Sequence, residues 1–317
     1  PQAGGEDAGF AWYVTGNRDD VSTDTRGLLV LQGGGDDVDA NYVRMGEFAG
    51  GGDFVVLRAS GADEYNDYIH ALCACDSVET VVFASREAAF DPFVLGRLGQ
   101  AEAIFIAGGD QSNYVRYWKD TPVEDAIHAV AAKPAPVGGT SAGMAIMGEF
   151  AYSAMTPASL TSDVALADPY ATDLTLERDF LHFAGLEGIL TDQHLIERDR
   201  IGRTLTMLAR LIEDGWAPAG KAVAADRETA VHLDPETGLA TVYATAGHTT
   251  PYAYFILADG APAVCRPGVP LTMPGLSVYR VGPGGGFDTR AWAGTGGIAY
   301  TFDVRDGQLT SSRGEIY

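Results

Sequence analysis

Short apolar runs alternate with amphipathic stretches through the first half of the chain. The apolar runs that predict buried strands are 28–31, 54–57, 81–84, 103–107 and the run that ends at Val137. The stretches that predict helices are 64–72, 92–98 and 123–132. Because strands that alternate with helices favour an open, mostly parallel sheet with helices on both faces, the pattern predicts an α/β fold.

Two regions depart from this alternation. Residues 151–190 are irregular, and a loop this long in a compact domain usually has a function, so we expect it to wall one side of a cleft. After about residue 222, short strands are separated by turns at 235–238, 259–262 and 282–286. We therefore expect one catalytic α/β domain over residues 1–317, with a β-rich extension from about residue 235 at the edge of the sheet.

Ser141 stands between small residues at the end of an apolar run, in the segment VGGTSAGM at 137–144. A strand that turns sharply into a helix lifts one side chain into the open, and small neighbours let the backbone make that turn. The segment is therefore either a nucleophile elbow or a Gly/Ser turn without chemistry. Two further polar segments favour the elbow.

The first of these segments, Gly-Gly-Asp-Gln at 108–111, follows a predicted strand, and its bare N–H groups could hold an oxyanion. The second, Thr-Asp-Gln-His at 191–194, precedes spaced arginines and a helical apolar pattern from Leu205 to Ile212. In an open α/β sheet, function collects at the carboxyl ends of the strands. Both Ser141 and the glycine turn are expected at that edge.

In these three segments the chain resembles the serine peptidases that comprise cyanophycinase and the aspartyl dipeptidases. The order and approximate spacing of the motifs match, and the resemblance extends from about residue 28 to 231. It implies a fold similar to that of class I glutamine amidotransferases. It also implies that Ser141 attacks a peptide carbonyl, that His194 takes and returns the proton, and that N–H groups of Gly109 and Ala142 hold the oxyanion.

The resemblance further implies a substrate cleft lined by polar side chains. These are Gln111, Asp192, Gln193, Arg198, Arg200 and Arg203. The guanidinium groups of the arginines can bind aspartyl carboxylates through paired hydrogen bonds, and Asp192 can pair with a guanidinium group of the substrate. A solvated helix face is the alternative interpretation of the spaced arginines when the resemblance is set aside.

The third catalytic position departs from the family pattern. The family usually shows Asp-Glu-x-Thr-Ala on the strand after the helical region, and here residues 226–230 read Asp-Arg-Glu-Thr-Ala. Glu228 is the candidate if the strand shifts by one residue, although neighbouring strand positions face opposite sides of a sheet. Asp226, or a residue outside this segment, is the alternative partner of His194.

The resemblance implies a peptidase that acts through an acyl-enzyme on cyanophycin or β-aspartyl peptides. Cyanophycin is a polyaspartate backbone that bears arginines through isopeptide bonds, and the product would be a β-aspartyl-arginine dipeptide. An aspartyl dipeptidase or another exopeptidase on the same scaffold is an alternative. A binding homologue that has lost efficient turnover is the alternative from another class, because Arg227 stands at the usual acid position.

Composition narrows the partners. The formal net charge of −22 would repel a nucleic-acid backbone, and no apolar run approaches the roughly 20 residues of a membrane span. The proposed chemistry requires no cofactor. No His or Cys residues show metal-ligand spacing, and the acidic segment 36–39 is expected to be solvated, so no metal site is predicted. His182 and His232, which have apolar neighbours, are expected in the core or in strands, and a homodimer is left open.

The cysteines bear on the compartment. Cys73 and Cys75 are too close in sequence to make a comfortable bridge, whereas either could reach Cys265 if the fold brings them together. Buried free thiols are the alternative. Such a bridge would suit an exported protein, and the chain begins at Pro1 without a signal sequence, as after removal of a signal peptide. A secreted or periplasmic location is therefore expected over a cytoplasmic one.

Overall fold

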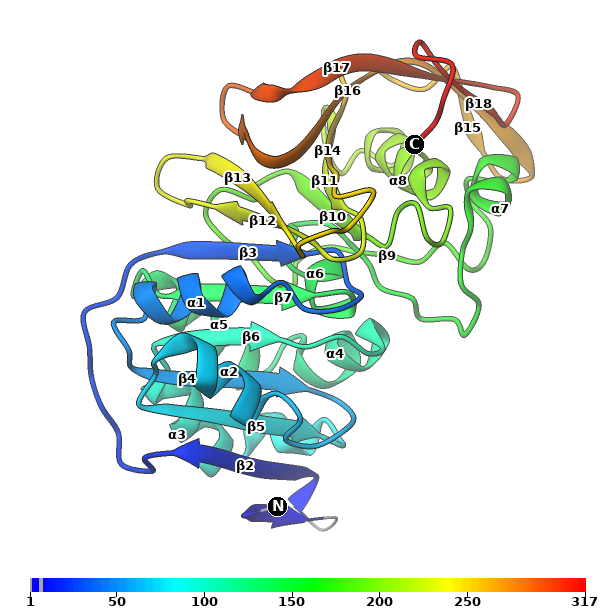
Figure 1. Ribbon diagram of the computed structural model, residues 1–317. Coiled ribbons are helices and arrows are strands. Elements are labelled where there is room, and N and C mark those ends of the chain that lie inside the picture. Colours follow the sequence, from blue (N-terminus) through cyan, green and yellow to red (C-terminus); the bar gives the residue numbers. More distant parts are fainter. Residues whose placement is uncertain (1, 6–7) are drawn as a thin grey trace.

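One large mixed sheet runs through the molecule and carries helices on its faces (Figure 1). The computed structural model describes residues 2–5 and 8–317. Its strands are β1 (Ala3–Gly5), β2 (Phe10–Gly16), β3 (Leu28–Gln32), β4 (Asp53–Arg58), β5 (Ser77–Phe83), β6 (Ala103–Ile106), β7 (Pro136–Thr140), β8 (Ala151–Tyr152), β9 (Leu176–Glu177), β10 (Ile189–Gln193), β11 (Gly220–Ala225), β12 (Thr229–Leu233), β13 (Leu239–Ala244), β14 (Ala253–Ala258), β15 (Val264–Arg266), β16 (Val269–Asp288), β17 (Ala293–Arg305) and β18 (Gln308–Ser311). Its helices are α1 (Asp39–Phe48), α2 (Asn66–Cys73), the 3-10 helix η2 (Glu87–Phe90), α3 (Pro92–Gln100), α4 (Gln111–Trp118), α5 (Pro122–Ala132), α6 (Ala142–Ala145), α7 (Ser162–Ala167) and α8 (Ile201–Glu213). None of the helices in the described ranges is long and apolar enough to cross a membrane.

The parallel part of the sheet has the order β5-β4-β6-β7-β3, and all four of its neighbouring pairs are parallel. Alternate residues of its strands enter different apolar clusters: Leu29 and Leu31 pack with α3 and α5, whereas Val30 packs with α1 and α2. Because side chains alternate across a strand, both faces of the sheet are covered. The predicted α/β fold is confirmed.

The C-terminal strands extend this sheet. Strand β12 pairs antiparallel with β3, and the order continues as β12-β13-β16-β14-β11-β10. The predicted β-rich extension is therefore present, but β14 and β16 lie between β13 and β11 and do not decorate an edge. Strand β16 is long enough, at 20 residues, to pair with β13, β14, β15 and β17 in turn.

The predicted helices and the strands at 28–31, 54–57 and 103–107 match the structure to within about two residues at each end, whereas β5 begins before the run 81–84 and β7 continues past Val137 to Thr140. The apolar pattern did not reveal the short helices α1, α4, α6 and α7 or the β1–β2 hairpin that pairs with β5 at the opposite edge of the sheet. The irregular segment 151–190 holds α7 and the small β8–β9 pair between loops. It ends where β10 begins, and His194, the predicted base, directly follows that strand.

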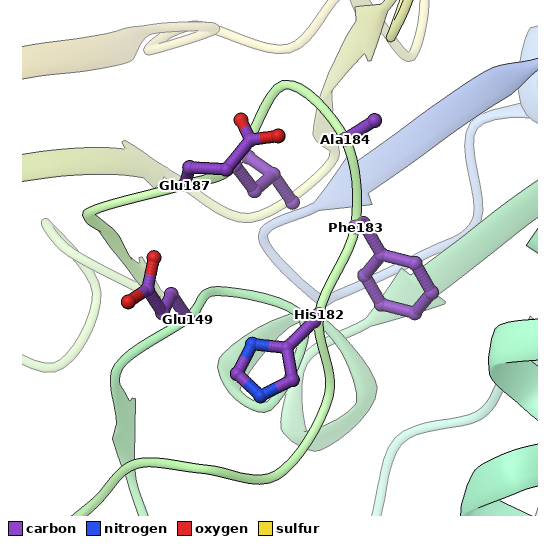
Figure 2. Close-up of a pocket in the computed structure, with 6 residues that line it drawn as sticks. Glu149, His182, Phe183, Ala184 and Glu187 are labelled. Atoms are coloured by element: carbon purple, nitrogen blue, oxygen red, sulfur yellow. The ribbon is translucent and has the colours of Figure 1, made fainter.

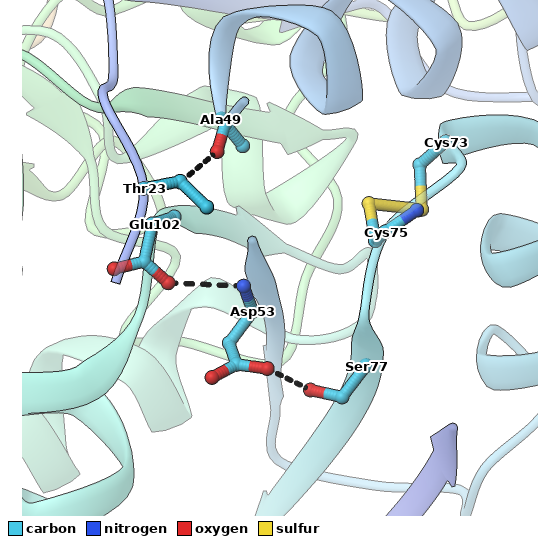
Figure 3. The surroundings of a disulfide bond; sticks show 7 residues. All are labelled: Thr23, Ala49, Asp53, Cys73, Cys75, Ser77 and Glu102. Atoms are coloured by element: carbon cyan, nitrogen blue, oxygen red, sulfur yellow. Dashed lines mark hydrogen bonds between the residues drawn. A yellow bond between two sulfur atoms is a disulfide. The ribbon is translucent and has the colours of Figure 1, made fainter. Parts of the chain in front are cut away.

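The cysteine pairing differs from the expectation. Cys73 and Cys75 form a disulfide with Cα atoms 5.2 Å apart (Figure 3). Cys265 is a buried free thiol. Ala74 adopts a left-handed conformation (φ 52°) that ends α2 and folds the two cysteines toward each other. Cys265 lies in a different apolar cluster, so a bridge from it to Cys73 or Cys75 is wrong.

Candidate active site

Ser141 occupies a sharp turn between β7 and α6. Its backbone angles, φ 52° and ψ −115°, are unfavourable for a residue with a side chain, and its side chain is only partly buried. The turn requires close packing on its helical side, because a Cβ at Gly143 would lie 2.0 Å from the carbonyl oxygen of Ile106. Ser141 therefore lies at a strained turn from strand to helix, and its role as a nucleophile stays a prediction.

The glycine turn after β6 lies beside this serine. A Cβ at Gly108 would lie 3.4 Å from the Ser141 Cβ, and Gly109 has a φ of 143°. Ala142 is the first residue of α6, so its N–H is not used in the hydrogen bonds of that helix. The structure thus brings together the two segments from which the sequence predicts an oxyanion hole, and the roles of Gly109 and Ala142 stay predictions.

His194 reaches Ser141 from the loop after β10. Its Nε2 lies 3.0 Å from the serine Oγ, a distance at which the hydroxyl donates to a neutral imidazole. The backbone of His194 is left-handed (φ 53°), and its N–H donates to the carbonyl of Gly33 at 3.0 Å. Burial lowers the pKa of His194, against the hydrogen bond with Glu197, which raises it. The imidazole is therefore held in the neutral, proton-accepting form near pH 7.

The other ring nitrogen of His194 contacts a residue that sequence reasoning missed. Nδ1 lies 2.8 Å from Oε2 of Glu197, whose side chain is 36% exposed. The hydrogen bond from His194 lowers the pKa of Glu197, so the carboxylate is ionised at neutral pH. A spacing of three residues places side chains on one side of a helical turn, which is the signal in the sequence that could have found this pair.

The two carboxylates predicted as partners of His194 are engaged elsewhere. Glu228 is paired with Arg227, and its second oxygen lies 3.4 Å from Nδ1 of His248. Asp226 is buried, accepts from the N–H of Ile196 at 3.2 Å and from the Thr250 hydroxyl at 3.0 Å. The expectation for Glu228 is thus corrected: the turn between β11 and β12 directs its carboxylate to His248, and Asp226 supports the backbone of the loop that carries His194.

A polar pocket of about 240 Å³ opens next to the glycine turn. It is lined by Gly109, Asp110, Gln111, Tyr152, Ala154, Thr156, Pro157, Ala158, Ser159, Arg198 and Arg200. The only carboxylate in this set, Asp110, caps α4 by accepting from the N–H of Ser112 at 2.9 Å. The predicted residues Gln111, Arg198 and Arg200 therefore meet at one cationic pocket, and the first part of the 151–190 segment forms its wall, as predicted.

Arg200 is the more buried of the two arginines in this pocket. One of its Nη atoms donates to the side-chain oxygen of Gln193 at 2.7 Å, and this hydrogen bond orients the guanidinium. Burial, followed by the charge of Arg203, lowers the pKa of Arg200 to about 9, which leaves it protonated at neutral pH. Arg198 is 46% exposed and stands at the rim.

Asp192 and Arg203 do not line the pocket, contrary to the prediction. Both side chains are 0% exposed and form an ion pair, and Thr204 donates to Asp192 at 2.7 Å. Because side chains alternate along β10, Asp192 faces α8, whereas the side chain of Thr191 donates to the carbonyl of Met144 on α6. The Arg203 guanidinium also lies 4.6 Å from the ring of Tyr152, so the pair supports the pocket wall.

Other polar groups that the sequence singled out lie apart from this site. His182 is exposed and not in the core as expected, and it lines a separate pocket of about 150 Å³ with Glu149 and Glu187 at the amino end of β10 (Figure 2). His232 is buried in β12, as predicted.

In the acidic segment 36–39, Asp37 accepts from the Tyr42 hydroxyl at 2.7 Å, and burial raises the pKa of Asp37. Within the described residues, no cluster of three or more acidic, His or Cys side chains could hold a metal ion.

Comparison with known proteins finds similarity to a family of peptidases. The model of peptidase family S51 matches residues 63–164, which include Ser141 and the glycine turn. A cyanophycinase of Synechococcus elongatus is 27% identical over 195 residues, which cover 58% of this chain and 57% of that protein. A cyanophycinase of Trichormus variabilis is 30% identical over 135 residues, which cover 42% of each chain. The chain thus matches 57% of the length of the first of these relatives and 42% of the second.

The fold has a relative among solved structures. The crystal structure of a peptidase from an acI-B1 Actinobacterium superposes with a TM-score of 0.54 at 13% identity, covering 84% of this chain and 98% of that one. This likeness supports the fold. The family match includes two of the three motifs and agrees with the predicted resemblance: the chain is similar to the peptidases of family S51 and to proteins named cyanophycinase.

Proposed function

We propose that this protein is a serine peptidase that hydrolyses cyanophycin or β-aspartyl peptides through an acyl-enzyme at Ser141. The observation that carries the proposal is the 3.0 Å contact between Ser141 Oγ and His194 Nε2 on a strained strand-to-helix turn. The similarity to proteins named cyanophycinase supports the substrate class.

The reaction proceeds in two halves. The Ser141 oxygen attacks the carbonyl carbon while its proton passes to His194 Nε2, and collapse of the tetrahedral intermediate returns that proton to the leaving amine. Water then attacks the acyl-enzyme with His194 as base, which releases the acid product and restores the serine. N–H groups of Ala142 and the glycine turn would stabilise the oxyanion in both halves.

The cationic pocket supports an acidic acyl part. Arg198 and Arg200 line it, and Asp110, the carboxylate among its lining residues, caps α4. Glu197 lies behind the rim, with its Oε1 4.0 Å from the Nε of Arg198. A guanidinium binds a carboxylate through two parallel hydrogen bonds, so an aspartyl side chain or α-carboxylate fits the pocket. The same chemistry would serve an aspartyl dipeptidase, which is the second candidate.

The proposal is tested with purified wild type and Ser141→Ala, incubated with cyanophycin and with a panel of short aspartyl peptides and followed by mass spectrometry. Release of β-aspartyl-arginine by wild type alone supports the proposal in full. Cleavage of short peptides alone moves the protein to the dipeptidase alternative. If neither substrate is cleaved and a serine-directed phosphonate labels neither protein, the chain is a binding homologue.

A further inference from the structure

Position 227 separates this chain from the family pattern, because an arginine stands where that pattern has a glutamate. We propose that Glu197 is the positioning residue for His194 in this protein, and that Arg227 keeps the neighbouring Glu228 away from the imidazole. This inference rests on the proposed function, since it assigns a role within the same Ser–His pair.

The contact of Glu197 fits a positioning role. Its Oε2 lies 2.8 Å from Nδ1 of His194, and the opposite ring nitrogen faces Ser141 Oγ at 3.0 Å. An ionised carboxylate at Nδ1 fixes the tautomer that leaves Nε2 free to accept the serine proton, and it stabilises the imidazolium that forms. Glu197 therefore occupies the place of the third member of a catalytic triad.

The loop that carries this pair is fixed at both ends. The N–H of His194 donates to Gly33 at 3.0 Å, and the N–H of Arg198 donates to the carbonyl of His194 at 3.2 Å. Between them, Asp226 accepts from the N–H of Ile196 at 3.2 Å. These backbone contacts hold the turn in which residues 194 and 197 face each other, so the short spacing yields a defined geometry.

Arg227 and His248 explain why the carboxylate of Glu228 does not contact His194. Arg227 pairs with Oε1 of Glu228, and His248 Nδ1 lies 3.4 Å from Oε2. The N–H of Glu228 also donates to the carbonyl of Gly34 at 2.6 Å. Each carboxylate oxygen of Glu228 thus has a basic neighbour, and the side chain cannot turn toward His194 without breaking the pair with Arg227.

The decisive variants are Glu197→Gln and Glu228→Gln, compared on an aspartyl peptide and by phosphonate labelling. Loss of a triad carboxylate lowers kcat by up to about 10⁴-fold with the site otherwise intact. We expect a fall of roughly 10³-fold or more for Glu197→Gln with KM nearly unchanged, a partial recovery in Glu197→Asp, and less than about a threefold change for Glu228→Gln. The reverse ranking would overturn the proposal.

The pH profile separates positioning from a purely structural effect. Burial and the charges of Arg198 and Arg200 lower the pKa of His194, whereas Glu197 raises it. Removing the carboxylate therefore moves the acidic limb of kcat/KM to lower pH in Glu197→Gln, and Glu228→Gln leaves it in place. A lower plateau with an unshifted limb in Glu197→Gln would contradict the assigned role.

A measurement that does not depend on turnover completes the test. Proton NMR of Ser141→Ala should show a downfield Nδ1–H resonance of His194 that disappears on adding Glu197→Gln and persists on adding Glu228→Gln. Its persistence without Glu197 refutes the inference. An inactive, unlabelled wild type with this resonance intact refutes the proposed peptidase instead, so the two failures are distinguishable.

Discussion

The nucleophile side and the histidine side of the site are built in different ways. Ser141 and the glycine turn stand at the ends of two adjacent parallel strands, β7 and β6, whose pairing fixes them. His194 and Glu197 lie in a loop after β10, where His194 and Asp199 both adopt left-handed backbone angles. Regular hydrogen bonding thus positions one side, whereas single backbone and side-chain contacts position the other. The histidine side should therefore be easier to break.

The largest expected effect is on the buried support of the histidine side. Asp192→Asn removes one charge from the fully buried pair with Arg203 and leaves the guanidinium uncompensated. Breaking such a pair costs about 3–5 kcal/mol of unfolding free energy. Urea denaturation measures the change, with Glu47→Gln in the exposed Arg44–Glu47 pair as the control, for which less than about 1 kcal/mol is expected. Equal stability of both variants would contradict the buried ion pair.

The next effect concerns Gly34, which borders the imidazole. A Cβ at this position would lie 2.1 Å from Nε2 of His194. Gly34→Ala should displace the ring and slow phosphonate labelling of Ser141 by about 10²-fold, the loss typical of a 1 Å misplacement. Gly188→Ala is the matched control, because its φ of +70° is also left-handed and no atom lies within 4 Å of the added Cβ. Similar labelling rates for the two variants would refute the close contact.

A smaller effect is expected at the pocket. Arg200→Met should raise KM for aspartyl peptides by roughly 10-fold or more, since a hydrogen bond to a charged group is worth about 1.5–3 kcal/mol. The KM for a peptide without a side-chain carboxylate should change less. Arg198→Met should have a weaker effect, because Arg198 is 46% exposed at the rim. Steady-state kinetics of the two variants check this order, and a larger effect at Arg198 would reverse it.

The smallest effect is a shift in pH dependence. Because burial lowers the pKa of His194, the midpoint of the decline in Ser141 labelling should lie below about pH 6.5, the ordinary value for histidine. The charge of Arg198 contributes to the lowering, so Arg198→Met should move this midpoint to higher pH. Labelling rates of wild type and Arg198→Met, measured from pH 4 to 8, test both expectations. A decline centred above pH 7 in wild type would be inconsistent with a buried neutral imidazole.

The sequence predicted what regular structure determines. Apolar runs located β3 to β7, and a serine between small residues at the end of such a run located the strained turn between β7 and α6. The Gly108–Gly109 turn could be placed near Ser141 because the carboxyl ends of parallel strands share an edge. These features depend on local pattern and sheet geometry, which a single sequence carries.

The sequence did not predict the partners of loop and helix side chains. Asp192 and Arg203 have the residue types of a binding site, and only the packing of α8 against β10 shows that they satisfy each other. Glu228 is next to the expected position, and only the turn between β11 and β12 shows that it faces His248. The direction of such side chains depends on tertiary contacts, which spacing alone does not specify.

The backbone conformation at Ser141 lowers the stability of the fold and serves the proposed chemistry. Its φ of 52° and ψ of −115° suit glycine, and strain of this kind costs of order 1–3 kcal/mol when a side chain is present. Selection for stability alone would favour Ser141→Gly, a variant that should melt at a higher temperature and form no acyl-enzyme. A hydroxyl at this position is then understandable as a loss of stability in exchange for reactivity, at the atom on which turnover would depend.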